Sequence, residues 1–250
     1  MRFVVIILLL VISFPVNANP VVRIAAAADL QLALPDVIEE FQKHNPKSNL
    51  SVTYGSSGVF TSQLRNGAPF ELFFSANTDF VNILYKDGLT LSEGTQYAFG
   101  RLAFISSEQL TSESASEAIL EWHHMMQSNQ KLSIANPLHA PYGMAAVDWL
   151  KNISIESLVQ SRLVMGENAA QSVQFVLAGA ARGGIVAWPL VANRESFQGQ
   201  AWLIPQDEHI PLEQKMVLMN RASQTAKDFY QFMQTEKAQK VLSSHGFGVP

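Results

Sequence analysis

The sequence predicts an α/β protein in which each sheet is mostly parallel and flanked by helices. Short apolar runs, rich in β-branched and aromatic residues, alternate along the chain with segments whose apolar residues recur at helical spacing. Such alternation is typical of parallel sheets covered on both faces. The 250 residues, 48% of them hydrophobic, suffice for one large domain or two small ones. The chain has no cysteine, so its core must stabilise it without disulfides.

In the first part of the chain, the pattern predicts strands at 21–26, 50–54 and 72–75. A helix should follow the first strand and end near Pro46, with Pro35 producing a kink or a short first turn. Further helices are expected at 59–65 and after Asn77, which can cap its helix.

The rest of the chain continues the alternation. Segment 106–117 is polar and is interpreted as a loop. Strands are expected at 101–105, 131–135, 163–165, 184–188, 201–204 and 215–219, and helices at 143–150, 169–177, 222–233 and 235–243.

The N-terminus has the features of a secretory signal peptide over residues 1–18. Arg2 is followed by an apolar run over 3–12, a helix-breaking Pro15 and a small-residue cleavage site at 16–18. An uncleaved anchor is the alternative, although polar residues follow at once. Cleavage removes Arg2 and changes the net charge from −4 to −5. A mildly acidic, exported chain without cysteine indicates the bacterial periplasm and argues against nucleic acid or anionic lipid as partners.

Four strand-to-helix turns are rich in small residues, and together they favour an anion site. They are 25–30 (AAAADL), 54–58 (YGSSG), 141–143 (PYG) and 166–171 (GENAAQ). Each leaves free backbone N–H groups at the positive end of a helix dipole, where small side chains let an anion approach. Each turn alone would more simply be a helix cap. Their occurrence together in one exported chain is what favours binding.

The chain resembles the periplasmic molybdate-binding proteins of ABC importers. The segments that carry the resemblance follow the family's order: 25–30, 54–58, 66–77 (NGAPFELFFSAN), 135–137 (ANP), 141–143, 166–168 (GEN), 184–187 (GIVA) and 245–247 (HGF). They span nearly the whole mature chain, and 66–77 is the most specific of them.

The resemblance implies a type II periplasmic-binding fold of two α/β lobes joined by two crossing strands, with the ligand in the cleft. Lobe 1 would comprise 19–99 plus 216–250, and lobe 2 would comprise 100–215. The implied protein is a monomer without a cofactor that captures molybdate or tungstate and delivers it to the importer's inner-membrane permease. The ligand-binding positions that match the family's pattern are Asp29, Ser57, Tyr142, Ala169 and Ala187.

Two of these positions depart from the family's pattern. Asp29 stands where many members carry Ser or Asn, and Ala187 stands where some place a Tyr hydroxyl. A carboxylate facing a dianion would repel it. We therefore expect Asp29 to turn aside and cap its own helix. The alternative is a protonated Asp29 that donates a hydrogen bond to the anion.

Other classes of function remain open but have less support. The sequence has no nucleophile elbow and no histidine placed for a triad, so we do not expect an enzyme. No spacing resembles a metal site, and adjacent His123 and His124 cannot easily share one ion. His139 deserves note because it lies just before Tyr142. A binding protein for another oxyanion or a small organic acid, or a sensory subunit, would have the same turns.

Overall fold

The computed structural model describes residues 20–250, so the expected signal peptide lies outside the described residues. Ten strands are present in the described part: β1 (Val22–Ala27), β2 (Leu50–Gly55), β3 (Leu72–Ser75), β4 (Thr95–Phe99), β5 (Leu102–Ser106), β6 (Leu132–Ala135), β7 (Leu163–Gly166), β8 (Gly183–Ala187), β9 (Gln200–Leu203) and β10 (Glu213–Leu218). The α-helices are α1 (Ala33–Gln42), α2 (Ser57–Arg65), α3 (Thr78–Lys86), α4 (Ala115–Met125), α5 (Pro141–Asn152), α6 (Glu156–Val159), α7 (Ala169–Leu177), α8 (Gln224–Phe232) and α9 (Glu236–Ser244). Short 3₁₀ helices are η1 (Ala28–Gln31), η2 (Gln160–Arg162), η3 (Trp188–Leu190) and η4 (Gln206–Glu208).

The strands form two five-stranded sheets, in the orders β2-β1-β3-β10-β4 and β7-β6-β8-β5-β9. In the first sheet, β10 runs antiparallel to both of its neighbours, while the other strands share one direction. In the second sheet, β5 is the reversed strand. Both sheets are therefore mostly parallel, and the α/β fold class is confirmed.

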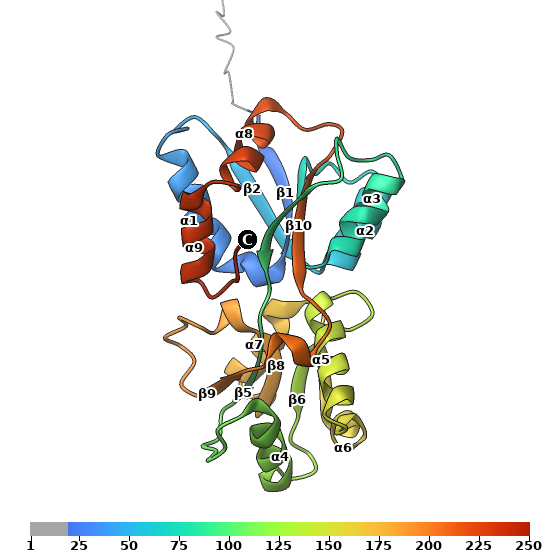
Figure 1. The fold of residues 1–250 in the computed structure, drawn as a ribbon, viewed down its shortest axis with the longest axis vertical. Helices are drawn as coiled ribbons and strands as arrows, with labels where there is room; N and C mark the ends of the chain where they lie inside the picture. The colour runs from blue at the N-terminus through green and yellow to red at the C-terminus, as the bar shows by residue number, and fades with distance from the viewer. Residues whose placement is uncertain (1–19) are drawn as a thin grey trace, which may run out of the picture.

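The two sheets belong to two lobes stacked end to end (Figure 1). The chain passes from β4 in the first lobe to β5 in the second and returns from β9 to β10. The reversed strands are thus the ones that follow each crossing. We propose the lobe boundaries at 99/100 and 212/213. The second lies slightly before the position expected from the sequence, because the residues from Glu213 onward pair with β4.

Local sequence explains most helix starts. The side chains of Asn77 and Asn168 accept hydrogen bonds from the first-turn N–H groups of α3 and α7. Pro35 lies in the first turn of α1, which follows the short η1 turn. The loop interpretation of 106–117 is wrong at its end, where Ser114 and Glu117 form a capping box and α4 begins. Strand β4 also went unpredicted.

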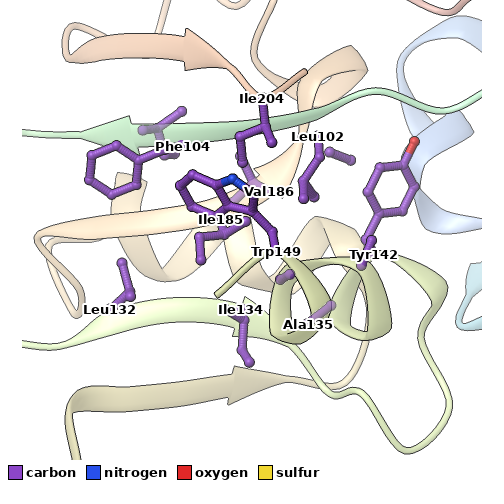
Figure 2. Packing of buried hydrophobic residues seen from close by; sticks show 14 of the residues in the cluster. Leu102, Phe104, Leu132, Ile134, Ala135, Tyr142, Trp149, Ile185, Val186 and Ile204 are labelled. Atoms are coloured by element: carbon purple, nitrogen blue, oxygen red, sulfur yellow. The ribbon is translucent and has the colours of Figure 1, made fainter. Parts of the chain in front are cut away.

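Each lobe has its own apolar core. The largest cluster fills the second lobe around Trp122 and Trp149. Tyr142 lies at one end of this cluster, and its hydroxyl points away from the other side chains, toward the first lobe (Figure 2). The first lobe packs two clusters, one on each face of its sheet. Among the described residues, no helix is both long and apolar enough to cross a membrane.

Gly100, at the first crossing, generates a testable prediction. A β-carbon there would lie 2.5 Å from Tyr142 Oη and 2.9 Å from Gln214 Nε2, atoms that belong to different lobes. We expect Gly100→Ala to destabilise the closed arrangement by about 1–3 kcal/mol, as overpacking does. Small-angle scattering should show a larger radius of gyration than in the wild type.

Gly248→Ala is the matched control, because its nearest neighbour would be Phe99 Cβ at 3.2 Å, within one lobe. An unchanged radius of gyration and melting temperature in Gly100→Ala would contradict the close-approach argument.

Candidate functional site

All five ligand-binding positions expected from the sequence lie where strands end and helices begin. Asp29 is in η1 after β1, and Ser57 and Ala169 open α2 and α7. Tyr142 lies in the first turn of α5, and Ala187 ends β8. Each is at most 6% exposed. The carboxyl ends of parallel strands are where α/β proteins bind ligands.

Inter-lobe contacts bring these positions together. The Tyr142 hydroxyl donates a hydrogen bond of 3.0 Å to Asp29 Oδ2. At a second contact between the lobes, Ser56 Oγ lies 2.8 Å from His139 Nδ1, and the Gly58 N–H donates to the His139 carbonyl at 2.9 Å. In addition, η1 packs against η3 and α7, the elements that follow Ala187 and begin at Ala169. The five positions therefore surround one region between the lobes.

Asp29 belongs to a buried hydrogen-bond network that crosses the hinge. Gln214 Nε2 donates to Asp29 Oδ2 and also lies 3.2 Å from Tyr142 Oη. The Tyr97 hydroxyl donates to Gln214 Oε1 at 2.5 Å, which fixes the orientation of the amide. The pairing of β4 with β10 shifts here: Gln214 opposes Ala98 and the next residue opposes Gln96, so that Tyr97 is left unpaired. Such a bulge re-aims side chains, here into the network.

The expectation that Asp29 caps its helix is wrong. The residue at the N-cap position of η1 is Ala27, and no side chain caps this turn. The carboxylate instead faces the second lobe, because Oδ2 accepts from Tyr142 and Gln214. Asp29 Oδ1 is buried and has no hydrogen-bond partner.

Burial dominates the ionisation of this network. It raises the pKa of Asp29 from 3.8 to about 6, although hydrogen bonds from Gln214 and Tyr142, and the nearby backbone N–H groups of Asp29 and Leu30, oppose the shift. Burial also raises the pKa of the Tyr97 and Tyr142 phenols well above 10, and the charge of Asp29 adds to both shifts. Both phenols therefore stay protonated and act as hydrogen-bond donors at physiological pH.

Ser57 accepts a hydrogen bond through its hydroxyl oxygen and keeps its own hydroxyl proton as a donor. Its Oγ accepts a hydrogen bond of 3.0 Å from the Ala76 N–H, and Ser57 is fully buried. A hydroxyl that accepts from the protein retains its own proton for another acceptor. Ser56, the preceding residue of the same turn, is instead bonded to His139. Neither serine side chain caps α2.

The first-turn N–H groups of α2, α5 and α7 complete the set of donors. The first N–H groups of an α-helix have no acceptor within the helix, and the dipole makes this end positive. Ser57, Tyr142 and Ala169 supply such groups from both lobes. Ala187 brings no side-chain donor, and the half-buried Trp188 that follows contributes its backbone N–H to the Arg101 carbonyl.

Neither Tyr97 nor Gln214 was predicted from the sequence as a member of the site. The one available signal for Gln214 was its amide side chain within a strand. Among residues 20–250, no group of three or more His, Cys, Asp or Glu side chains is arranged to hold a metal ion.

The fold and the site define a two-lobed protein with a buried polar network where its lobes meet. The model of the family described as bacterial extracellular solute-binding protein matches residues 22–248. The chain belongs to this family.

Several relatives resemble the chain over most of its length. The molybdate-binding protein ModA of Azotobacter vinelandii is 31% identical over 232 residues, which cover 91% of this chain and 90% of that protein. ModA of Rhodobacter capsulatus is 30% identical over 80% of this chain and 79% of its own. Among solved structures, the periplasmic molybdate-binding protein of Azotobacter vinelandii has the same fold. It superposes with a TM-score of 0.82 at 24% identity, covering 92% of this chain and 99% of that one.

The raised pKa of Asp29 predicts a pH-dependent stability of the ligand-free protein. A carboxyl whose pKa is raised on folding contributes stability below its unfolded pKa, and this stability is lost as pH rises through the folded value. Between about pH 4 and pH 7, the shift from 3.8 to about 6 corresponds to a loss of about 3 kcal/mol. Asp29→Asn should lack this loss.

Urea unfolding of both proteins across this range tests the prediction, because the difference between them cancels the other titrations. A difference that stays constant with pH would contradict it.

Proposed function

We propose that the protein captures a small tetrahedral oxyanion, molybdate or tungstate, in the cleft between its lobes. The observation that carries this proposal is the convergence of three helix N-termini on one buried region. Ser57, Tyr142 and Ala169 supply first-turn N–H groups there, and Ser57 adds a free hydroxyl proton. Neutral dipoles of this kind hold an anion without a basic surface.

The relatives support molybdate as the ligand. Two proteins named as molybdate-binding are at least 30% identical to this chain over four fifths of its length or more. Tungstate is the same kind of ligand, a tetrahedral dianion. Sulfate differs from both mainly in size, so the closeness of the lobes would set the preference among these anions.

The remaining parts of the proposal follow from the class of protein. The protein would act in the periplasm after cleavage of residues 1–18, as a monomer without a cofactor, and without chemical turnover of its ligand. It would deliver the anion to the permease of an ABC importer. Both lobes contribute ligand donors, so binding would hold them closed in the form that the permease receives.

Ligand binding should raise the stability of the purified mature protein. A ligand at 100 times its dissociation constant adds about 2.7 kcal/mol to the free energy of unfolding. We expect melting temperature to rise with molybdate and tungstate, and less or not at all with sulfate and phosphate. A shift with an organic acid and none with either group-6 oxyanion, measured by calorimetry, would reject the proposal.

Ser57 and Ser56 provide a matched pair of variants. Ser57→Ala should weaken molybdate binding by about 1.5–3 kcal/mol, as for a hydrogen bond to a charged group. It should also lower apo stability by about 1–3 kcal/mol, because the buried Ala76 N–H loses its acceptor.

Ser56→Ala removes only the bond to His139, so it should affect affinity less. Equal losses of affinity in the two variants, measured by titration calorimetry, would show that Ser57 does not donate to the anion.

A further inference from the structure

The unpartnered oxygen of Asp29 is the feature of the site that oxyanion binding by neutral donors leaves unexplained. Asp29 is 1% exposed, and its Oδ1 is buried without a hydrogen-bond partner. A buried polar atom left unpaired is costly, so such atoms usually mark an absent partner. Asp29 lies in η1, which packs against η3 and the start of α7, where the other ligand-binding positions converge.

The hydrogen bonds of the network determine which Asp29 oxygen can carry a proton. Oδ2 already accepts from two donors, Tyr142 and Gln214. The Tyr97 hydroxyl donates to the carbonyl oxygen of Gln214, which leaves the Gln214 amide nitrogen facing Asp29 and Tyr142. A proton on this carboxyl therefore belongs on Oδ1.

Charge balance at the site also calls for a proton. A dianion beside an ionised Asp29 would place three negative charges in a buried cleft, where repulsion is strong. Within the described residues, no ion pair joins Asp29 to a cation. His139 faces Ser56 and Glu167, and the buried Nε of Arg101 has no hydrogen-bond partner.

The ionisable residues on the elements around Asp29 do not change this balance. Neither α7 nor η3 carries any. The others, on β1, α1, β2, β4, α5 and β10, are Arg23, Asp36, Glu39, Glu40, Tyr54, Tyr97, Tyr142, Asp148, Lys151, Glu213 and Lys215. Of these, the phenols of Tyr97 and Tyr142 belong to the network of Asp29, and both are neutral donors.

We propose that one proton is held between Asp29 Oδ1 and an oxygen of the bound oxyanion, so that the anion enters the site together with a proton. This inference rests on the proposed function and specifies the ligand as an oxyanion plus one proton. For a dianion such as molybdate, the proton comes from solvent and resides on Asp29 Oδ1, which donates to the anion. An oxyanion that already carries a proton would donate its own to the carboxylate. Asp29 thereby determines specificity for an oxyanion that binds together with one proton.

Titration calorimetry with sodium molybdate tests the proposal. Wild-type protein is titrated at pH 8 in two buffers of different ionisation enthalpy, which gives the number of protons taken up per anion. We expect about one, and a dissociation constant that rises roughly tenfold per pH unit between pH 7 and 8.5, as linkage requires above the pKa of the group. The raised pKa of Asp29, about 6, places this range above its titration in the free protein.

Two variants locate the proton. Asp29→Asn should bind molybdate with no proton uptake and a dissociation constant nearly independent of pH. Asp36→Asn, the matched control, removes an exposed carboxylate that contacts His245 in the first lobe, and should behave as the wild type. The buffer comparison on wild-type protein needs no variant, so poor folding of Asp29→Asn would not remove the test.

Molybdate binding to wild-type protein without proton uptake would overturn this inference and leave the proposed function standing. The same holds if Asp29→Asn keeps the pH dependence of the wild type. Absence of molybdate binding in the wild type and in Asp36→Asn would overturn both.

Discussion

The hydrogen bonds that Asp29 accepts are the interaction on which the closed arrangement of the lobes depends. One donor, Tyr142, comes from the second lobe, and the other, Gln214, comes from the returning hinge strand. Burial makes an ionised carboxylate costly, so these donors are needed to stabilise the charged form of Asp29. The bulge at Tyr97 and the absence of a side chain at Gly100 are what allow the donors to reach it. The residues that shape the hinge therefore also position the donors to the Asp29 carboxylate.

Much of the fold, and the helix starts that form part of the site, could be predicted from local sequence. Apolar periodicity located most strands and helices, and small residues at helix starts indicated where an anion could meet backbone N–H groups. Asn77 is a cap that sequence identified correctly. The start of α4 was missed because its capping box, Ser114 and Glu117, stands in a polar stretch that has the composition of a loop.

The network around Asp29 could not be predicted for a different reason. Gln214 and Tyr97 are separated by more than a hundred residues, and a register shift between two strands aims them at the carboxylate. Local sequence carries no information about such a shift. Without these donors in view, capping is the reasonable role for an Asp before a helix. The structure gives it a role between the lobes, at the position where the family's pattern offers a neutral side chain.

The place of β10 in the first sheet has a consequence for the order of folding. The strands of the second lobe are contiguous in the chain, so this sheet can assemble as soon as β9 exists. The first sheet cannot, because β10 lies between β3 and the edge strand β4. Strand β4 can pair with β10 only after the entire second lobe has been synthesised. Such a long-range closure slows folding. A nascent chain would therefore have one finished lobe and one open sheet. Loss of the C-terminal residues would remove an interior strand of the first lobe, together with α8, which packs on that strand, and α9, which packs on α1 and β4.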